Sequence, residues 1–180
     1  MKTSELLVAC LEMEGIEYIF GVPGEENADF MIALEQSDSI RFILTRHEQG
    51  AAFMAEAYGR LTGHPAACLG TLGPGATNLI TGVANANMDR VPMLVLTGQG
   101  STSRLHKESH QIMDVVGMFK AVTKWATSIR SPSSVPEIVR KAIRLACSEK
   151  PGACHIELPE DIAKAEVSAQ PLEVRSYSDS

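Results

Sequence analysis

Short, continuously apolar runs alternate along this chain with longer segments of helical period, and no other feature restricts the fold as strongly. Apolar runs of strand length occupy residues 18–22, 41–44, 66–70, 92–96 and 153–158. Helical spacing covers residues 7–14, 27–34, 48–62 and 74–88, and a further helix passes through 138, 142 and 145. Strands that are apolar throughout are typical of parallel sheets covered on both faces. The sequence therefore predicts an α/β fold, a doubly wound, mostly parallel sheet with helices on both faces.

Several predicted helices carry recognisable signals at their ends. Thr3 or Ser4 is the expected N-cap of the first helix, and Gly15 is the residue expected to stop it. Ser134-x-x-Glu137 matches a capping box, in which the two side chains would bond to each other's backbone N–H groups. This pattern predicts the start of the last long helix.

A change in composition marks the expected end of the folded unit. Beyond Ala165 the chain becomes polar and rich in serine. We therefore expect residues 1–164 to form a single domain, as suits a chain of 180 residues, and residues 165–180 to be a linker.

Charge and cysteine usage narrow the class of function. The net charge is −6 and no stripe of Lys and Arg offsets it, so we expect neither nucleic acid nor a membrane surface as a partner, and small-molecule chemistry is favoured. No apolar run approaches 18 residues and no signal-peptide pattern opens the chain, so a soluble, cytoplasmic protein is expected. Four cysteines without a C-x-x-C pair are interpreted as reduced thiols in the core: Cys10, Cys68, Cys147 and Cys154.

The candidate binding loops follow the predicted strands, because an open parallel sheet binds ligands beyond the carboxyl ends of its strands. Four of these loops are unusual in composition: residues 21–27, 46–52, 70–78 and 97–100. Their glycines permit close approach of a ligand but do not show which ligand it is. Gly73-Pro74-Gly75 could cradle a phosphate, but no Walker lysine follows, and Asn78 takes the sixth place of a dinucleotide-binding motif instead of glycine. A tight turn between strand and helix explains the same residues equally well.

Glu48 is the most suggestive single residue, because it stands between a predicted buried strand and a helix rich in small residues. Burial at such a position would raise the pKa of a carboxyl group and suit it to general acid–base chemistry. A glutamate in a first helical turn also stabilises the helix through its dipole, without any chemistry. The small residues likewise have two interpretations, a tightly packed core or an interface with another domain or subunit.

Two histidines have the spacing of a possible metal site. His106 and His110 are spaced i, i+4, with Glu108 between them, but the surrounding segment is polar and offers no clear further ligand. We therefore assign no metal. With Arg104 and Lys107, these residues are interpreted as a solvated loop or one that faces a partner domain.

Taken together, four segments resemble the N-terminal pyrimidine-binding domain of thiamine-diphosphate-dependent enzymes, and the similarity is closest to the acetolactate synthase group. They are Gly21-Val22-Pro23-Gly24, Arg46-His47-Glu48-Gln49-Gly50-Ala51-Ala52, Gly73-Pro74-Gly75-Ala76-Thr77-Asn78 and Thr97-Gly98-Gln99. The order and separation of the motifs match over most of the chain, from about Lys2 to Asp161. Four motifs that occur together are far more specific than any one alone.

The resemblance implies a role for each matching residue. Glu48 is implied as the catalytic glutamate, which hydrogen-bonds N1′ of the cofactor's aminopyrimidine so that the 4′-amine removes the thiazolium C2 proton. Gln99 and Gln111 are implied to face the active site from the side of the partner domain. Cofactor contacts are implied for Val22, Pro23, Gly24, Glu48, Gly73, Pro74 and Asn78.

The resemblance further implies thiamine diphosphate as the cofactor, with only its pyrimidine end bound by this domain. Mg²⁺, and FAD where one is used, would be held by domains this sequence lacks, since it contains no Gly-Asp-Gly motif. The implied reaction decarboxylates pyruvate and condenses the hydroxyethyl unit with a second 2-oxo acid, as in branched-chain amino acid biosynthesis. Each site would lie between two subunits of a homodimer or homotetramer and be completed by a C-terminal diphosphate-binding domain. The chain alone would then be inactive, and residues 165–180 would lead toward a central domain.

Two departures from the family pattern keep alternatives open. Biosynthetic acetolactate synthases typically carry Gln-Val-Pro and Phe-Gln-Glu where this chain has Gln99-Gly100-Ser101 and His110-Gln111-Ile112. The alternatives are another thiamine-diphosphate 2-oxo acid decarboxylase or lyase, of the sulfoacetaldehyde or oxalyl-CoA type, and a non-catalytic α/β dimerisation module. A glyoxylate carboligase is disfavoured, because that relative lacks the glutamate that Glu48 supplies here.

Overall fold

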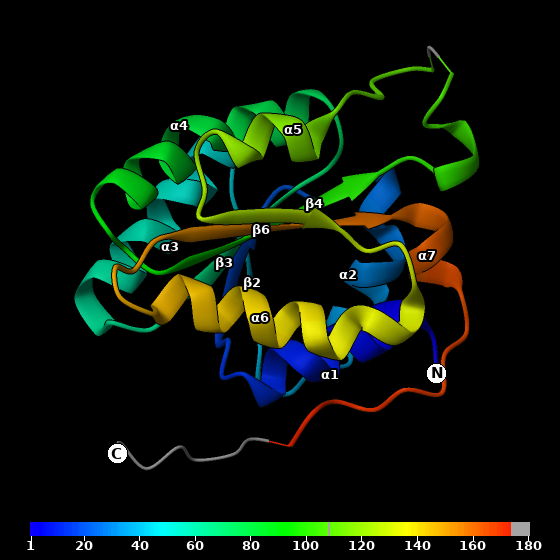
Figure 1. Ribbon diagram of the computed structural model, residues 1–180, viewed down its shortest axis with the longest axis horizontal. Coiled ribbons are helices and arrows are strands. Elements are labelled where there is room, and N and C mark those ends of the chain that lie inside the picture. Colours follow the sequence, from blue (N-terminus) through cyan, green and yellow to red (C-terminus); the bar gives the residue numbers. More distant parts are fainter. Residues whose placement is uncertain (108, 174–180) are drawn as a thin grey trace.

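A single six-stranded parallel sheet forms the centre of the protein (Figure 1). The computed structural model describes residues 1–107 and 109–173. The strand order is β2-β1-β3-β4-β6-β5, and every neighbouring pair is parallel. The strands are β1 (Tyr18–Gly21), β2 (Arg41–Leu44), β3 (Ala66–Gly70), β4 (Met93–Gln99), β5 (Trp125–Ser128) and β6 (Ala153–Pro159). The predicted parallel α/β fold is confirmed.

Helices cover both faces of this sheet, as the continuously apolar strands predict (Figure 1). Side chains of α1, α2, α6 and α7 share one core cluster, and those of α3, α4 and α5 share the other. The α-helices are α1 (Thr3–Met13), α2 (Ala28–Glu35), α3 (Glu48–Thr62), α4 (Pro74–Met88), α5 (Val115–Lys120), α6 (Val135–Cys147) and α7 (Glu160–Lys164). Short 3₁₀ turns are η1 (Glu25–Asn27), η2 (Thr102–Arg104) and η3 (Pro132–Ser134).

The helices α3 and α4 have the predicted bounds because local signals set their ends. The Nδ1 atom of His47 accepts a hydrogen bond from the N–H of Gln49 at 3.1 Å and so caps α3. Gly63 ends that helix with a φ of 74°. Pro74 occupies the first position of α4, where its missing N–H costs nothing.

Two predictions about helix starts are wrong. The N-cap of α1 is Lys2, while Thr3 and Ser4 lie buried inside the helix. The Thr3 hydroxyl instead donates to the carbonyl oxygen of Ala165 at 2.8 Å. Ser134 does precede α6, but its hydroxyl donates to Ser131 at 2.7 Å and forms no capping box. Tertiary and turn partners compete successfully for these hydroxyl groups.

The strand predictions fail at the far edge of the sheet and at the end of β4. The edge strand β5 was not predicted, because its sequence Trp-Ala-Thr-Ser is not continuously apolar. Strand β4 continues three residues beyond Leu96, so Thr97 and Gln99 belong to the strand and not to the following loop. Of the four cysteines, Cys147 is exposed, which corrects its assignment to the core.

The segment after α7 lies along the domain. The N–H of Val167 donates to the carbonyl oxygen of Met1 at 2.9 Å. The guanidinium of Arg140 on α6 donates to the carbonyl oxygens of Leu172 and Glu173 at 2.9 and 2.8 Å. The proposed boundary between residues 164 and 165 stays a prediction, and residues 174–180 of the expected linker lie outside the described residues.

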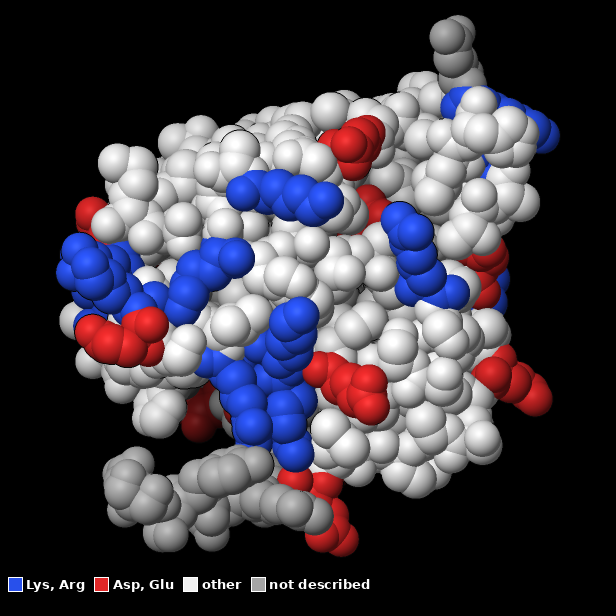
Figure 2. All heavy atoms as spheres, viewed as in Figure 1, with Lys and Arg blue, Asp and Glu red and all other residues white. Residues whose placement is uncertain are grey.

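A group of cationic side chains lies over α6 on the face seen in Figure 2. Nε of Arg140 donates to Glu14 at 2.5 Å, and the ammonium of Lys141 lies 4.5 Å from the ring centre of Trp125. Lys124 donates to carbonyl oxygens at the end of α6. These cations therefore bind groups of the domain itself. Within the part of the chain that is described, no helix is long and apolar enough to cross a membrane.

Candidate functional site

The carboxyl ends of β1 and β3 carry two of the predicted binding loops, and these loops touch. Val22 follows β1, and its N–H donates to the carbonyl oxygen of Leu69 on β3 at 3.3 Å. A Cβ atom on Gly24 would lie 2.2 Å from Cγ2 of Thr71, so a larger residue here would displace the Thr71 side chain. Val22 is half-buried and Pro23 is exposed, so both border the surface beside the loops.

The carboxylate of Glu48 faces the first turns of α4. Glu48 is the first residue of α3 and is half-buried, not enclosed as the sequence suggested. The side-chain amide of Asn78 on α4 donates to its Oε2 atom at 3.0 Å. The Cβ position on Gly75 lies 3.5 Å from its Oε1 atom. Among the described residues Oε1 accepts no hydrogen bond, so it is available to a ligand.

The loop between β3 and α4 has a backbone that only glycine adopts easily at position 73. Gly73 has φ 51° and ψ −117°, the geometry of the first central residue of a type II′ turn. A Cβ atom there would lie 2.6 Å from the backbone oxygen of Gln111. The segment around Gln111, itself at φ 59°, therefore packs against the loop. Pro74 is exposed beside it.

The structure thus brings most of the predicted site residues together: Val22, Pro23, Gly24, Glu48, Gly73, Pro74, Asn78 and the backbone of Gln111. The side chain of Gln111 is exposed. The roles expected for these residues toward a cofactor or substrate stay predictions.

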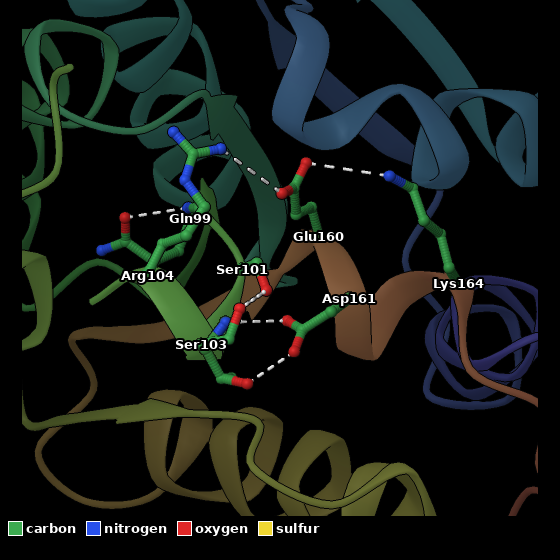
Figure 3. Close-up of polar contacts among 9 residues, drawn as sticks. Gln99, Ser101, Ser103, Arg104, Glu160, Asp161 and Lys164 are labelled. Carbon is green, nitrogen blue, oxygen red and sulfur yellow. Dashed lines mark hydrogen bonds and ion pairs between the residues drawn. The ribbon is translucent and has the colours of Figure 1, made fainter. Parts of the chain in front are cut away.

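Gln99 differs from the other predicted residues, because its side chain is 2% exposed and fully engaged inside the domain. Its Nε2 atom donates to Glu157 at 3.0 Å and to the carbonyl oxygen of Met113 at 3.1 Å. Its Oε1 atom accepts from the N–H of Gly100 at 3.0 Å (Figure 3). These contacts favour an indirect role for Gln99 at the site.

Sequence reasoning missed a buried polar group beside Gln99. Thr97 on β4 and His155 on β6 are joined by a hydrogen bond of 2.8 Å, and the His155 ring stacks on Phe119 at 4.2 Å. Burial lowers the pKa of His155 to about 3, and burial raises the pKa of Glu157. A signal was available: Thr97-x-Gln99 and His155-x-Glu157 place polar residues at alternate positions of apolar strands, hence on one face.

The loop after β4 is anchored at its base and is not simply a solvated segment. Both the N–H and the hydroxyl of Thr102 donate to the carboxylate of Asp161, at 3.0 and 2.5 Å (Figure 3). Arg104 lies 3.9 Å from Glu160.

The two histidines spaced i, i+4, His106 and His110, are exposed, and Glu108 lies outside the described residues. No cluster suited to a metal ion occurs in residues 1–107 and 109–173.

The site's chemistry fits a nitrogen heterocycle that carries an amino group. Oε1 of Glu48 can accept a hydrogen bond from a ring nitrogen or hold its proton, while Asn78 fixes the other carboxylate oxygen. A Cβ atom on Gly75 would lie 2.7 Å from Oγ1 of Thr71, so bare backbone borders the carboxylate. An open parallel α/β domain with a carboxylate bordered by bare backbone at the carboxyl ends of its strands belongs to the class of organic-cofactor-binding domains.

Comparison with known families identifies the family within this class. The profile of the thiamine pyrophosphate enzyme, N-terminal TPP binding domain family matches residues 1–118, and the chain belongs to this family. The resemblance noted from the sequence is therefore confirmed.

Curated relatives agree on the family but differ in their named reactions. The chain is 41% identical over 170 residues to a probable acetolactate synthase large subunit of Methanocaldococcus jannaschii, covering 94% of this chain and 29% of the relative. It is 42% identical over 170 residues to an acetolactate synthase of Arthrospira platensis, with 93% and 29% covered. It is also 40% identical over 172 residues to a glyoxylate carboligase of Escherichia coli O157:H7, with 95% and 29% covered. The chain thus spans under a third of these relatives' length, and identity alone does not separate the two reactions.

Proposed function

We propose that this chain supplies the pyrimidine-binding part of an acetolactate-synthase-like enzyme, which decarboxylates pyruvate and joins the resulting two-carbon unit to a second 2-oxo acid. The observation that carries the proposal is the pair formed by Glu48 and Asn78 at the starts of α3 and α4, with Oε1 of Glu48 available to a ligand. When bound, thiamine diphosphate supplies the electron sink for decarboxylation and carbon–carbon bond formation.

The residues of this chain would bind and orient the pyrimidine and control one proton. Asn78 fixes Oε2 of Glu48, so that Oε1 points to one place and can hold or accept a proton at a ring nitrogen. The helix dipole of α3 stabilises the carboxylate at its first residue. The backbone around Gly73 and Gly75 lets a planar ring approach without meeting side chains.

The exposed surface of α3 and α4 supports the proposal of a second subunit. Large apolar side chains are exposed on these helices, namely Phe53 (38%), Met54 (47%), Leu61 (85%) and Met88 (80%). Such exposure is typical of an interaction surface and supports the proposed homodimer or homotetramer. In this proposal Mg²⁺, and FAD where one is used, are held by other domains, and residues 165–180 lead toward a central domain. The cytoplasmic location stays a prediction.

The alternatives concern the reaction, because the family itself is shown. The sequence departs from the biosynthetic acetolactate synthase pattern at Gly100-Ser101 and at His110 to Ile112. Another 2-oxo acid decarboxylase or lyase is therefore the second candidate. A glyoxylate carboligase remains disfavoured by Glu48, although one relative carries that name.

Product analysis of the full-length protein tests the proposal. The protein is supplied with thiamine diphosphate, Mg²⁺ and pyruvate, with and without FAD, while carbon dioxide and acetolactate are followed. We expect acetolactate from the parent, almost none from Glu48→Gln, and normal amounts from Glu35→Gln, which changes an exposed carboxylate at the end of α2. Carbon dioxide without acetolactate would move the assignment to a decarboxylase. Near-parental turnover by Glu48→Gln would show that this residue does not carry the chemistry.

A further inference from the structure

One buried amide group joins the two ends of the segment that connects β4 to α5. Gly100 begins this segment and donates to Oε1 of Gln99, while Met113 near its end accepts from Nε2 of the same side chain. The amide of Gln99 therefore bridges Gly100 and Met113, the two ends of the segment called loop 100–113 below, of which residues 100–107 and 109–113 are described. Closing such a loop through one side chain reduces its conformational freedom without a covalent link.

Glu157 fixes which way this amide points. Its Oε2 atom accepts from Nε2 of Gln99 at 3.0 Å, and a carboxylate only accepts hydrogen bonds. If the amide turned over, its oxygen would face Glu157 and the Met113 carbonyl, and its NH₂ would face the N–H of Gly100. All three contacts would become repulsive. Because Glu157 is 4% exposed, water cannot readily replace the lost partner.

Three further groups face the Glu157 carboxyl from neighbouring segments. Ser128 on β5 and the positive charge of Arg130 lower the pKa of Glu157, and the negative charge of Asp114 raises it. Burial is the largest influence and raises the pKa of Glu157. Either an ionised carboxylate or an uncharged amide oxygen at this position can accept the bond from Gln99.

The closed loop leads directly to the site. Gln111 lies two residues before Met113, and its backbone oxygen sits 2.6 Å from where a Cβ atom on Gly73 would be. Gly73 precedes α4, and Asn78 on that helix holds Glu48. The start of the same loop is held separately, by Thr102 on Asp161 (Figure 3). Its end is bonded to Gln99 through the carbonyl oxygen of Met113.

We propose that Gln99 and Glu157 are positioning residues that seat the end of loop 100–113 against Gly73 and so shape the cofactor side of the Glu48 site. This inference rests on the proposed function only for its link to the cofactor. The closure of the loop itself can be tested without any activity.

The test compares four variants of the full-length protein. Glu157→Leu and Gln99→Met remove the hydrogen bond with side chains of similar size, whereas Glu157→Gln keeps an acceptor. The control is Glu56→Leu, which removes another buried carboxylate on α3, away from the loop; Glu56 accepts from the amide of Asn85 at 2.8 Å and from Arg60 at 2.6 Å.

Two readouts are used for each variant. Trypsin cleavage at Arg104 and Lys107, both exposed in the loop, reports on its opening in the protein without cofactor. The concentration of thiamine diphosphate that gives half-maximal activity, compared with kcat, reports on the site. We expect cleavage and this concentration each to rise about tenfold in Glu157→Leu and Gln99→Met, the size given by one lost buried hydrogen bond, with kcat changed much less. Glu157→Gln should resemble the parent in both readouts, and Glu56→Leu should resemble the parent in cleavage of the loop.

The outcomes separate failure of this inference from failure of the proposed function. Parental cleavage rates in Glu157→Leu and Gln99→Met would overturn the proposed positioning role of Gln99 and Glu157, whatever the activity. Glu157→Gln as damaging as Glu157→Leu would also overturn it, because the charge and not the hydrogen bond would then matter. If cleavage rises as expected while the parent shows no cofactor-dependent activity, the positioning role of Gln99 and Glu157 is supported and the proposed function is wrong. If Glu157→Leu does not fold, Gln99→Met alone decides.

Discussion

Replacing Gly73 by alanine should cost several kcal/mol of folding free energy, because two separate penalties meet at this residue. The first is conformational. Its φ of 51° and ψ of −117° are disfavoured for any L side chain, at a cost of about 1–3 kcal/mol. The second is steric. The new Cβ atom would lie 2.6 Å from the backbone oxygen of Gln111 and 2.9 Å from its Cβ, and such overpacking costs about 1–3 kcal/mol.

The sum is a loss of about 2–6 kcal/mol if the surroundings stay in place. If the segment around Gln111 moves away instead, the loss of stability shrinks towards the conformational part. The displacement would then appear at the site, as a weaker response to thiamine diphosphate. Gly73→Ala therefore damages either stability or cofactor use.

Three other glycines separate the two penalties. At Gly50 in α3 the new Cβ meets nothing within 4 Å, so Gly50→Ala should stabilise by about 0.5–1 kcal/mol. Gly63 has a φ of 74° and also open space, so Gly63→Ala should cost about 1–2 kcal/mol from conformation alone. Gly59 is helical, but its Cβ would lie 2.6 Å from the Pro92 oxygen, so Gly59→Ala should cost about 1–3 kcal/mol from contact alone.

Urea unfolding followed by circular dichroism measures these differences, provided the denaturant slope stays constant across the series. The expected order of stability is Gly50→Ala, parent, the two single-penalty variants, then Gly73→Ala. The reasoning is refuted if Gly73→Ala is no less stable than Gly63→Ala and responds normally to thiamine diphosphate. A neutral Gly59→Ala would refute the use of Cβ distances to judge contact.

Two further predictions concern the pH dependence of stability and the segment after α7, residues 166–173. The pKa of His155 is about 3 in the folded protein and 6.5 in an unfolded chain, so the unfolded state binds more protons between these values. The unfolding free energy should therefore fall as pH drops below 6.5, by about 1.4 kcal/mol per unit, and this slope should decrease in His155→Gln; an unchanged slope would contradict the cause. Arg140→Met should free the carbonyl groups of Leu172 and Glu173 and speed amide hydrogen exchange in residues 166–173, whereas Lys141→Met should not; equal exchange in both variants would argue against the contact.

Local signals explain why much of the fold could be predicted. The bounds of β2, α3, β3 and α4 follow from residues within those elements or next to them, such as Gly63 and Pro74. The position of Glu48 at the start of α3 follows from the same signals. The resemblance to the thiamine-diphosphate enzymes likewise rests on motifs that are each short and contiguous.

Other features depend on partners far away in the sequence. The edge strand β5 forms because it pairs with β6 through backbone hydrogen bonds, not because its own residues are apolar throughout. The hydroxyl of Thr3 donates to the carbonyl oxygen of Ala165 and does not cap α1 as expected. Gln99 was expected to face the site, but Glu157, 58 residues later, engages its amide within the domain.

The sequence by itself determined the fold class, the order of the binding loops and Glu48 as the candidate catalytic residue. Only the tertiary structure decided that Asn78 holds one oxygen of Glu48 and that Gln111 packs on Gly73. Helical and strand periods are set by neighbours a few residues apart, so they can be read along the chain. Hydrogen-bond partners of buried groups are set by which strands and helices become adjacent, and that is known only once the sheet has formed.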